Sequence, residues 1–149
     1  MTRVATRVVR RNKQLTQELT NEATKGVRRA VSRAVTIVHR TAVDSIQNAP
    51  RGGEQYIRYG EGQRRVGRAS AAGEPPASDT GFLANNIMFE VESGGLSGRV
   101  ERRAAYSTHL EFGTKNMRAR PFMQPALEEH KKKITAMVRD ELKKAIKGL

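Results

Sequence analysis

Apolar residues between positions 15 and 46 recur at steps of three or four, with polar and charged residues between them. The positions are Leu15, Leu19, Ala23, Val27, Val31, Ala34, Val38, Ala42 and Ile46. This spacing predicts one long amphipathic helix with a continuous apolar stripe. The helix is expected to end at Asn48-Ala49-Pro50, because the residue before a proline is driven out of the helical conformation.

An unbroken helix of this kind would be roughly 50 Å long at 1.5 Å per residue. One small core does not cover such a length, and the alanine and valine of the stripe let another backbone approach closely. Two interpretations stay open with equal weight. The helix packs partly on a neighbouring subunit, or it is the core helix of a monomer.

Both flanks of this helix are basic. Residues 1–13 carry five basic side chains and no acid. This composition predicts a solvated basic tail, with a phosphate-contacting arm as the alternative, in front of a single domain over residues 14–149.

Residues 51–78 combine glycine and proline with arginine and few apolar residues, which predicts a long mobile loop. Its arginines are Arg51, Arg58, Arg64, Arg65 and Arg68. Tyr56 and Tyr59 lie between them, so these arginines are candidates for contact with DNA, although two tyrosines are a weak signal.

The second half of the chain alternates between turns and short periodic segments. Asp79, Thr80 and Gly81 supply turn and capping residues. Apolar alternation over 87–91 and 96–101 predicts an antiparallel hairpin. Residues 104–112 fit a short helix better than a third strand, and a second helix runs from Pro125 to the C-terminus. The expected fold class is α+β: a long N-terminal helix, a Gly/Pro/Arg-rich loop, an antiparallel hairpin or small sheet, a short helix and a C-terminal helix.

Composition narrows the function classes. The 149 residues, 37% of them hydrophobic, suit one domain with a modest core. The formal charge of +13 favours contact with polyanions. The absence of cysteine excludes disulfides, thiolate nucleophiles and cysteine-ligated metals. No stretch approaches the ~18 apolar residues that cross a bilayer, so we expect a chain made in the cytosol without membrane contact.

The chemistry-bearing motifs are weak. Asp79-Thr80-Gly81 matches the triplet of dimeric aspartic proteases, but it follows a proline-rich segment instead of an apolar strand, which favours a turn or cap. His109-Leu-Glu111 has the spacing of zinc deaminases without their cysteines. No glycine motif for phosphate binding is present. We expect no catalytic residue, no cofactor and no metal. Glu111 is a candidate for an ion pair with Arg118 or Arg120 across the turn, either at an interface or on the plain surface.

Three blocks of sequence carry a family resemblance. They are Gly73-Glu-Pro-Pro-Ala-Ser-Asp-Thr-Gly-Phe-Leu83, Tyr106-x-x-x-Leu110-Glu-Phe-Gly-Thr114 and Arg120-Pro-Phe-Met-x-Pro-Ala-Leu127. In this order the blocks resemble the neck or tail-completion proteins, also described as tail components, of long-tailed bacteriophages and related prophages. The resemblance covers about residues 12–147. It departs from the family at Ser107-Thr108-His109, which is more polar than usual after the tyrosine.

The resemblance implies a non-enzymatic virion protein, made in the host cytoplasm, that forms a ring around the DNA channel at the neck or tail. A hexamer is favoured over a dodecamer. The implied partners are neighbouring head-completion proteins, tail-terminator or tail tube proteins, and double-stranded DNA bound without sequence preference.

A ring needs two different contact patches on each subunit. One is assigned to Tyr106, Leu110, Glu111, Phe112, Gly113, Thr114, Arg120, Pro121 and Phe122, and the other partly to the helix stripe. Residues 71–95 hold four acids and no base, so the hairpin region of one subunit is expected to meet a basic face of the next. The alternative function is a free basic nucleic-acid-binding protein.

Overall fold

The computed structural model describes residues 3–60 and 62–148. Its elements are α1 (Arg3–Gln47), β1 (Gln55–Gly60), β2 (Gln63–Arg68), α2 (Phe82–Asn85), β3 (Ile87–Val91), β4 (Gly98–Arg102), α3 (Ser107–Phe112) and α4 (Met123–Lys147). Within the described residues the strands form two separate antiparallel pairs, β1–β2 and β3–β4. This mixture of helices and small antiparallel sheets confirms the expected α+β fold class.

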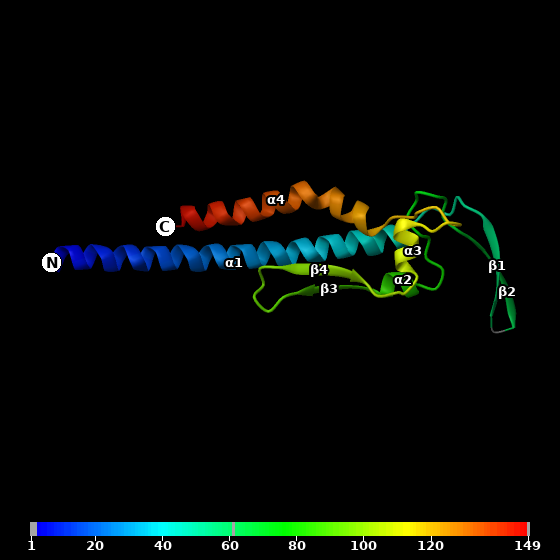
Figure 1. Cartoon of the computed structure of the whole chain (residues 1–149), viewed down its shortest axis with the longest axis horizontal. Helices are drawn as coiled ribbons and strands as arrows, with labels where there is room; N and C mark the ends of the chain where they lie inside the picture. Colours follow the sequence, from blue (N-terminus) through cyan, green and yellow to red (C-terminus); the bar gives the residue numbers. More distant parts are fainter. Residues whose placement is uncertain (1–2, 61, 149) are drawn as a thin grey trace.

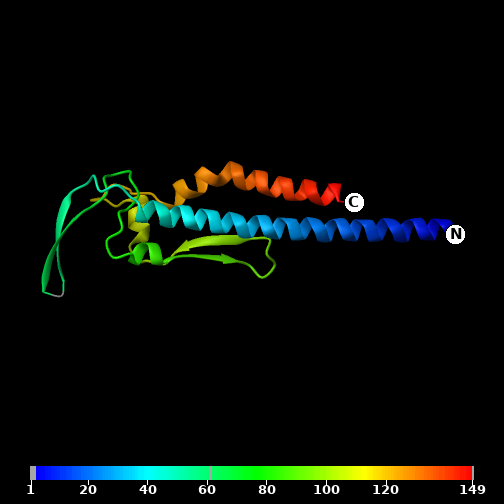
Figure 2. The same ribbon diagram turned by 180° about the vertical axis from the view of Figure 1, so that it is seen from behind.

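Helix α1 confirms the prediction of one long helix and is longer than predicted. It has 45 residues, so it spans about 68 Å. It begins at Arg3, so most of the segment expected as a separate tail belongs to the helix. No glycine or proline interrupts residues 3–14, and Val4 and Val8 continue the apolar spacing toward Leu15. The first two residues of the expected tail lie outside the described residues. Side chains 10–18 are all exposed, and this end of α1 runs on beyond the end of α4 (Figures 1 and 2).

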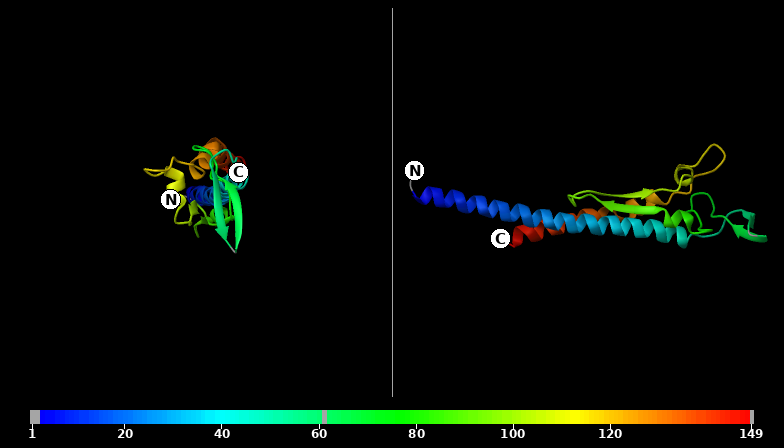
Figure 3. Two further views of the ribbon diagram at one scale, coloured as in Figure 1. Left: turned by 90° about the vertical axis from the view of Figure 1, so that its right-hand side faces the viewer. Right: turned by 90° about the horizontal axis from the view of Figure 1, so that it is seen from below.

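The body of the molecule forms around the C-terminal half of α1. Helix α4 lies antiparallel to α1, and the β3–β4 hairpin packs on another side of it (Figures 1 and 3). The core cluster consists of Val38, Ala42, Ile46, Leu83, Ala84, Ile87, Ala104, Phe122 and Ala126. Only the C-terminal half of α1 therefore packs into the core cluster. Within the described residues no helix is long and apolar enough to cross a membrane.

The β3–β4 hairpin has the position and the pairing predicted for it. Phe89 lies opposite Val100 and Glu90 lies opposite Arg99. Ile87 is buried against the core, whereas Met88 and Glu90 on the other face are exposed. A Cβ on Gly98 would come within 2.6 Å of Val35 Cγ2, so this glycine lets β4 approach α1 closely.

Residues 51–78 are not the continuous loop that we expected. Strands β1 and β2 form a hairpin within them, here called the arm (residues 55–68), which projects from the end of the molecule opposite to the N-terminus (Figure 1). Two bonds close its base, from Gly53 N–H to Ala69 C=O and from Ala69 N–H to Glu54 C=O, each 2.9 Å. The few apolar residues of the arm face each other across the strands, and Ile57 lies opposite Val66.

Helices α3 and α4 agree with the sequence prediction, whereas the four-residue helix α2 was not predicted. The short helix α3 falls inside the predicted span 104–112. Helix α4 begins two residues before Pro125, which therefore lies in the first turn, where its missing N–H costs no hydrogen bond.

Candidate subunit interface between the arm and the body

A cavity of about 460 Å³ lies where the arm joins the body, and we call it the junction pocket. Its walls come from the arm, the turn before α2, helix α3 and the segment before α4. Among the lining residues are Arg58, Asp79, Tyr106, Leu110 and Arg120. The structure thus brings together residues from three groups that the sequence singled out separately: the arginine-rich segment, the turn and the block around Tyr106.

The turn before α2 is built differently from the predicted cap. The carboxylate of Asp79 accepts a hydrogen bond from Arg58 Nη1 at 2.7 Å, so Asp79 ties the arm to the body and does not cap α2. Thr80 Oγ1 instead accepts from the N–H of Phe82 at 3.3 Å. Gly81 has φ 77°, a left-handed conformation that favours glycine. Thr80 and Gly81 therefore shape the chain just before α2.

Glu111 does not pair with Arg118 or Arg120, and that prediction is wrong. Its side chain is buried, with the residue 5% exposed. The carboxylate accepts hydrogen bonds from the backbone N–H groups of Phe122 and Met123, both at 3.1 Å, and of Gln124 at 2.9 Å.

These three donors lie at the N-terminus of α4, where backbone N–H groups have no partner inside the helix and the helix dipole is positive. A carboxylate from α3 thus caps α4. No local sequence pattern indicates this role, because the capping carboxylate lies 11 to 13 residues before the groups that it caps.

The predicted interface block divides into an internal and an external part. Phe122, 1% exposed, belongs to the core, and Leu110 packs against the core. Tyr106 and Phe112 are exposed. Within this block the aromatic surface left for a partner is therefore that of Tyr106 and Phe112, while Glu111 and Phe122 hold the chain together.

The other members of the block shape the loop between α3 and α4. Gly113 has φ 75°, and a Cβ there would lie 2.8 Å from Met117 O, so the turn requires glycine. Thr114 pairs with Met117 through an isolated antiparallel β-bridge, and Thr114 is exposed. Pro121 and Arg120 are partly buried, and Arg120 Nε has no hydrogen-bond partner within the described residues.

The two exposed aromatic residues at the ends of α3, Tyr106 just before it and Phe112 as its last residue, face different cavities. Tyr106 lines the junction pocket and stacks on Phe82, with ring centres 6.3 Å apart. Phe112 lines a second cavity, and the guanidinium of Arg102 lies 5.5 Å from its ring centre. Helix α3 therefore separates two distinct concave surfaces.

The second cavity is an apolar groove of about 600 Å³, which we call the α1 groove. Its apolar walls are Val31, Ala34, Val35 and Val38 of α1, Leu96 and Val100 of the hairpin, Phe112 of α3, and Met123, Leu127, Ile134 and Val138 of α4. The groove was not predicted from the sequence. Periodicity locates the apolar stripes of both helices, but it does not say which part of a stripe remains uncovered.

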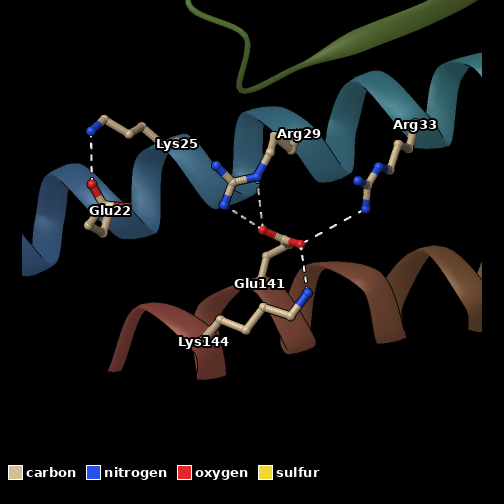
Figure 4. A network of polar contacts seen from close by, with 6 residues as sticks. All are labelled: Glu22, Lys25, Arg29, Arg33, Glu141 and Lys144. Carbon is tan, nitrogen blue, oxygen red and sulfur yellow. Dashed lines mark hydrogen bonds and ion pairs between the residues drawn. The ribbon is translucent and has the colours of Figure 1, made fainter. Parts of the chain in front are cut away.

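A cluster of charges joins the far end of α4 to the middle of α1 (Figure 4). The carboxylate of Glu141, only 6% exposed, lies 2.8 Å from Arg29 Nη2 and 3.2 Å from Lys144 Nζ. The hydrogen bond from Arg29, followed by that from Lys144, holds the pKa of Glu141 below its ordinary value, although burial acts in the opposite direction. A Cβ on Gly26 would lie 3.1 Å from Glu141 Cβ, so this glycine allows the close approach.

The five arginines proposed for DNA contact are not equivalent. Arg51 donates to the Ser78 carbonyl at 2.8 Å, and Arg58 is bound to Asp79. Arg64, Arg65 and Arg68 are exposed, and no carboxylate of the described residues lies within 4.0 Å of them. Only these three present a guanidinium to solvent without a partner among the described residues.

Two of the three histidines have structural contacts, whereas His109 is exposed. His39 Nε2 lies 3.0 Å from the Ile87 carbonyl oxygen, and His130 Nε2 lies 2.8 Å from Thr41 Oγ1. In the described part of the chain no three histidine, aspartate or glutamate side chains are grouped to hold a metal ion.

Comparisons of the chain with models of protein families, with curated proteins and with solved structures find no match.

Proposed function

We propose that this protein is a structural virion protein of the phage head–tail junction, which forms a ring around the DNA channel and joins head to tail. The observation that carries the proposal is a pair of unlike surfaces on one chain: a projecting arm with exposed apolar residues and an apolar groove on the body. A closed ring needs two different patches on each subunit, which meet head to tail. The three sequence blocks that resemble phage neck and tail-completion proteins support the same function.

The shape of the chain also supports assembly. The described side chains at the N-terminal end of α1 are exposed over at least residues 10–18, and the arm leaves the body at the opposite end. Neither segment contributes to the core cluster. Long segments that extend from a small core are typical of subunits that reach their neighbours.

The charge of the protein suits a DNA conduit. At +13 the protein attracts phosphate, and contacts to the phosphate backbone carry no sequence information. A ring with this charge would hold DNA of any sequence and still let it slide. Its expected neighbours are a head-completion protein on one side and a tail-terminator or tail tube protein on the other.

The test is the mass and shape of the purified protein, measured by light scattering and negative-stain imaging with and without isolated phage tails. We expect the purified protein to form a ring of six subunits, or of twelve, either alone or on the tails. Deletion of its gene from the phage is expected to give tails that are not joined to heads. Virions that assemble normally without this protein would overturn the proposal.

A second candidate is a free basic protein that binds nucleic acid as a monomer. The exposed Arg64, Arg65 and Arg68 on a projecting hairpin favour it, since basic and aromatic residues together grip nucleic acid. It predicts tight, salt-sensitive DNA binding by a monomer that ignores tails.

A further inference from the structure

The α1 groove is an apolar surface without a cover in its own chain. Valines of α1 form its floor, and the side chains of Leu96, Phe112 and Leu127 on its walls are exposed. Helix α4 and the β3–β4 hairpin both pack on α1 but leave the strip between them open. An apolar groove of this size is a docking surface for another chain.

One face of the arm is an unpartnered surface of the same kind. The strand register puts Ile57 and Val66 opposite each other, with Tyr59 next to them on the same face. These side chains are 47%, 56% and 76% exposed. A hairpin of two strands is only marginally stable in water unless its apolar face is covered.

The other face of the arm already has a partner. Tyr56 and Arg58 point from that face into the junction pocket, and Arg58 is fixed by Asp79. This anchor sets the direction of the arm, which leaves the body on the side away from the N-terminus, whereas the α1 groove lies along α1 (Figures 1 and 3). The arm therefore does not reach the groove of its own chain, and an arm that enters the groove would have to come from a second copy.

The edge of β4 offers such an arm a backbone partner. Residues of β4 line the groove and residues of β3 do not, so the side of β4 that is not paired with β3 faces the groove. An extended segment that enters the groove can add to this edge by backbone hydrogen bonds while its side chains meet the apolar floor.

The hairpin beside the groove is acidic, whereas the arm is basic. Glu90 and Glu101 lie on the hairpin face turned away from the groove, and both are already bound to Arg99. Glu92 lies in the β3–β4 connection, which also carries the groove residues Leu96 and Ser97, and it has no ion-pair partner among the described residues. Arg64 and Arg68, on the apolar face of the arm, have no carboxylate partner there either. An arm docked near this connection would bring an arginine close to Glu92 and would offset part of the repulsion between two chains of +13.

We propose that the arm of one copy docks in the α1 groove of the next, with Ile57 and Val66 against the apolar walls and a strand of the arm along β4. The contact is head to tail, because the arm and the groove are different surfaces. The inference rests on the proposed ring function, since this contact would be the interface between the subunits of the ring.

The absence of cysteine makes a direct crosslinking test available. In the double variant Val66→Cys/Leu127→Cys, mild oxidation is expected to give a ladder of covalent multimers on a non-reducing gel, because each copy carries both halves of the crosslink. Either single variant gives dimers at most. The matched control is Val66→Cys/Ile146→Cys, which puts the second thiol on an exposed residue of the same helix outside the groove. A ladder no stronger than that of this control would overturn the inference.

A mixing experiment tests the head-to-tail geometry. Ile57→Glu/Val66→Glu disables the arm and Leu127→Arg disables the groove, and all three residues are exposed, so both variants keep the fold. We expect each variant alone to be monomeric and their equimolar mixture to give a one-to-one dimer without rings, since one intact arm and one intact groove remain. Rings formed by either variant alone would contradict the inference.

The two proposals fail in different ways. Wild-type rings together with a ladder no stronger than the control would refute arm docking and leave the ring function standing. A strong ladder from a protein that never binds tails or virions would support arm docking and refute the head–tail function.

Discussion

Two buried carboxylates fasten the two ends of α4 to the rest of the chain. At its N-terminus Glu111 accepts three backbone N–H groups, and near its C-terminus Glu141 is held by Arg29 and Lys144. Between these points α4 forms one wall of the open α1 groove. The polar contacts at both ends therefore hold α4 in position, although the apolar side chains in its middle line an open groove and are only partly covered.

Glu111→Ala should lower the free energy of unfolding by about 2 kcal/mol, because it leaves three backbone donors at a buried helix end without their acceptor. Urea denaturation followed by circular dichroism measures the change. The control is Glu128→Ala, which removes an exposed ion pair with Lys131 and should cost less than about 0.5 kcal/mol. Equal losses in both variants would show that Glu111 does not cap α4.

Glu141→Gln should destabilise the protein in a pH-dependent way. The folded protein holds the pKa of Glu141 below the ordinary value of 4.5, so the carboxylate contributes stability above that pH. This contribution falls as the pH drops from 4.5 through the lower pKa of the folded state. The difference in unfolding free energy between wild type and variant, from urea denaturation at pH 7 and in steps down to pH 3, should therefore shrink. A constant difference would contradict the assignment.

At the scale of elements, α1, the β3–β4 hairpin and α4 were predictable because apolar residues repeat in them with the period of a helix or a strand. The arm was not, because Ile57 and Val66 are its only aliphatic pair and arginine and glycine fill the surrounding positions. The cap by Glu111 and the α1 groove also could not be predicted from the sequence. Both depend on where α3 and α4 meet in space, and a local sequence pattern does not contain this information.

Replacement of residues 55–68 by two glycines should remove the arm and leave the body intact. Glu54 and Ala69 are already hydrogen-bonded across the base of the arm, so a two-residue turn can join them. We expect the unfolding free energy of the body to change by less than about 1 kcal/mol and ring formation to be lost. Light scattering and thermal unfolding on the same sample check both, and unchanged rings would show that the arm is not the contact.

At the scale of the whole molecule, exposed basic residues are present at both ends of a rod. Arg10, Arg11 and Lys13 are exposed at one end, and the arginines of the arm lie at the other. If the arm docks on a neighbouring subunit, its arginines face protein in the assembled ring. The contact with DNA then falls to other basic residues, of which the exposed end of α1 holds a dense group.

The affinity of the assembled protein for duplex DNA should fall with salt to the same extent for any sequence. From 50 to 200 mM salt we expect a loss of about a thousandfold or more if six or more phosphates are contacted. Changing Arg10, Arg11 and Lys13 together to glutamine should lower the slope of log affinity against log salt by about 3. Fluorescence anisotropy with two unrelated duplexes measures both effects. A slope that the triple variant leaves unchanged would place the DNA elsewhere.

The length of α1 has a mechanical consequence. A continuous helix of about 68 Å, held by the body at one end only, is a lever. A rotation of a few degrees where a subunit sits on its neighbour would move the far tip of this helix by several ångströms. Small adjustments at the subunit contacts would thus be magnified into a change in the width of whatever opening the helix tips surround.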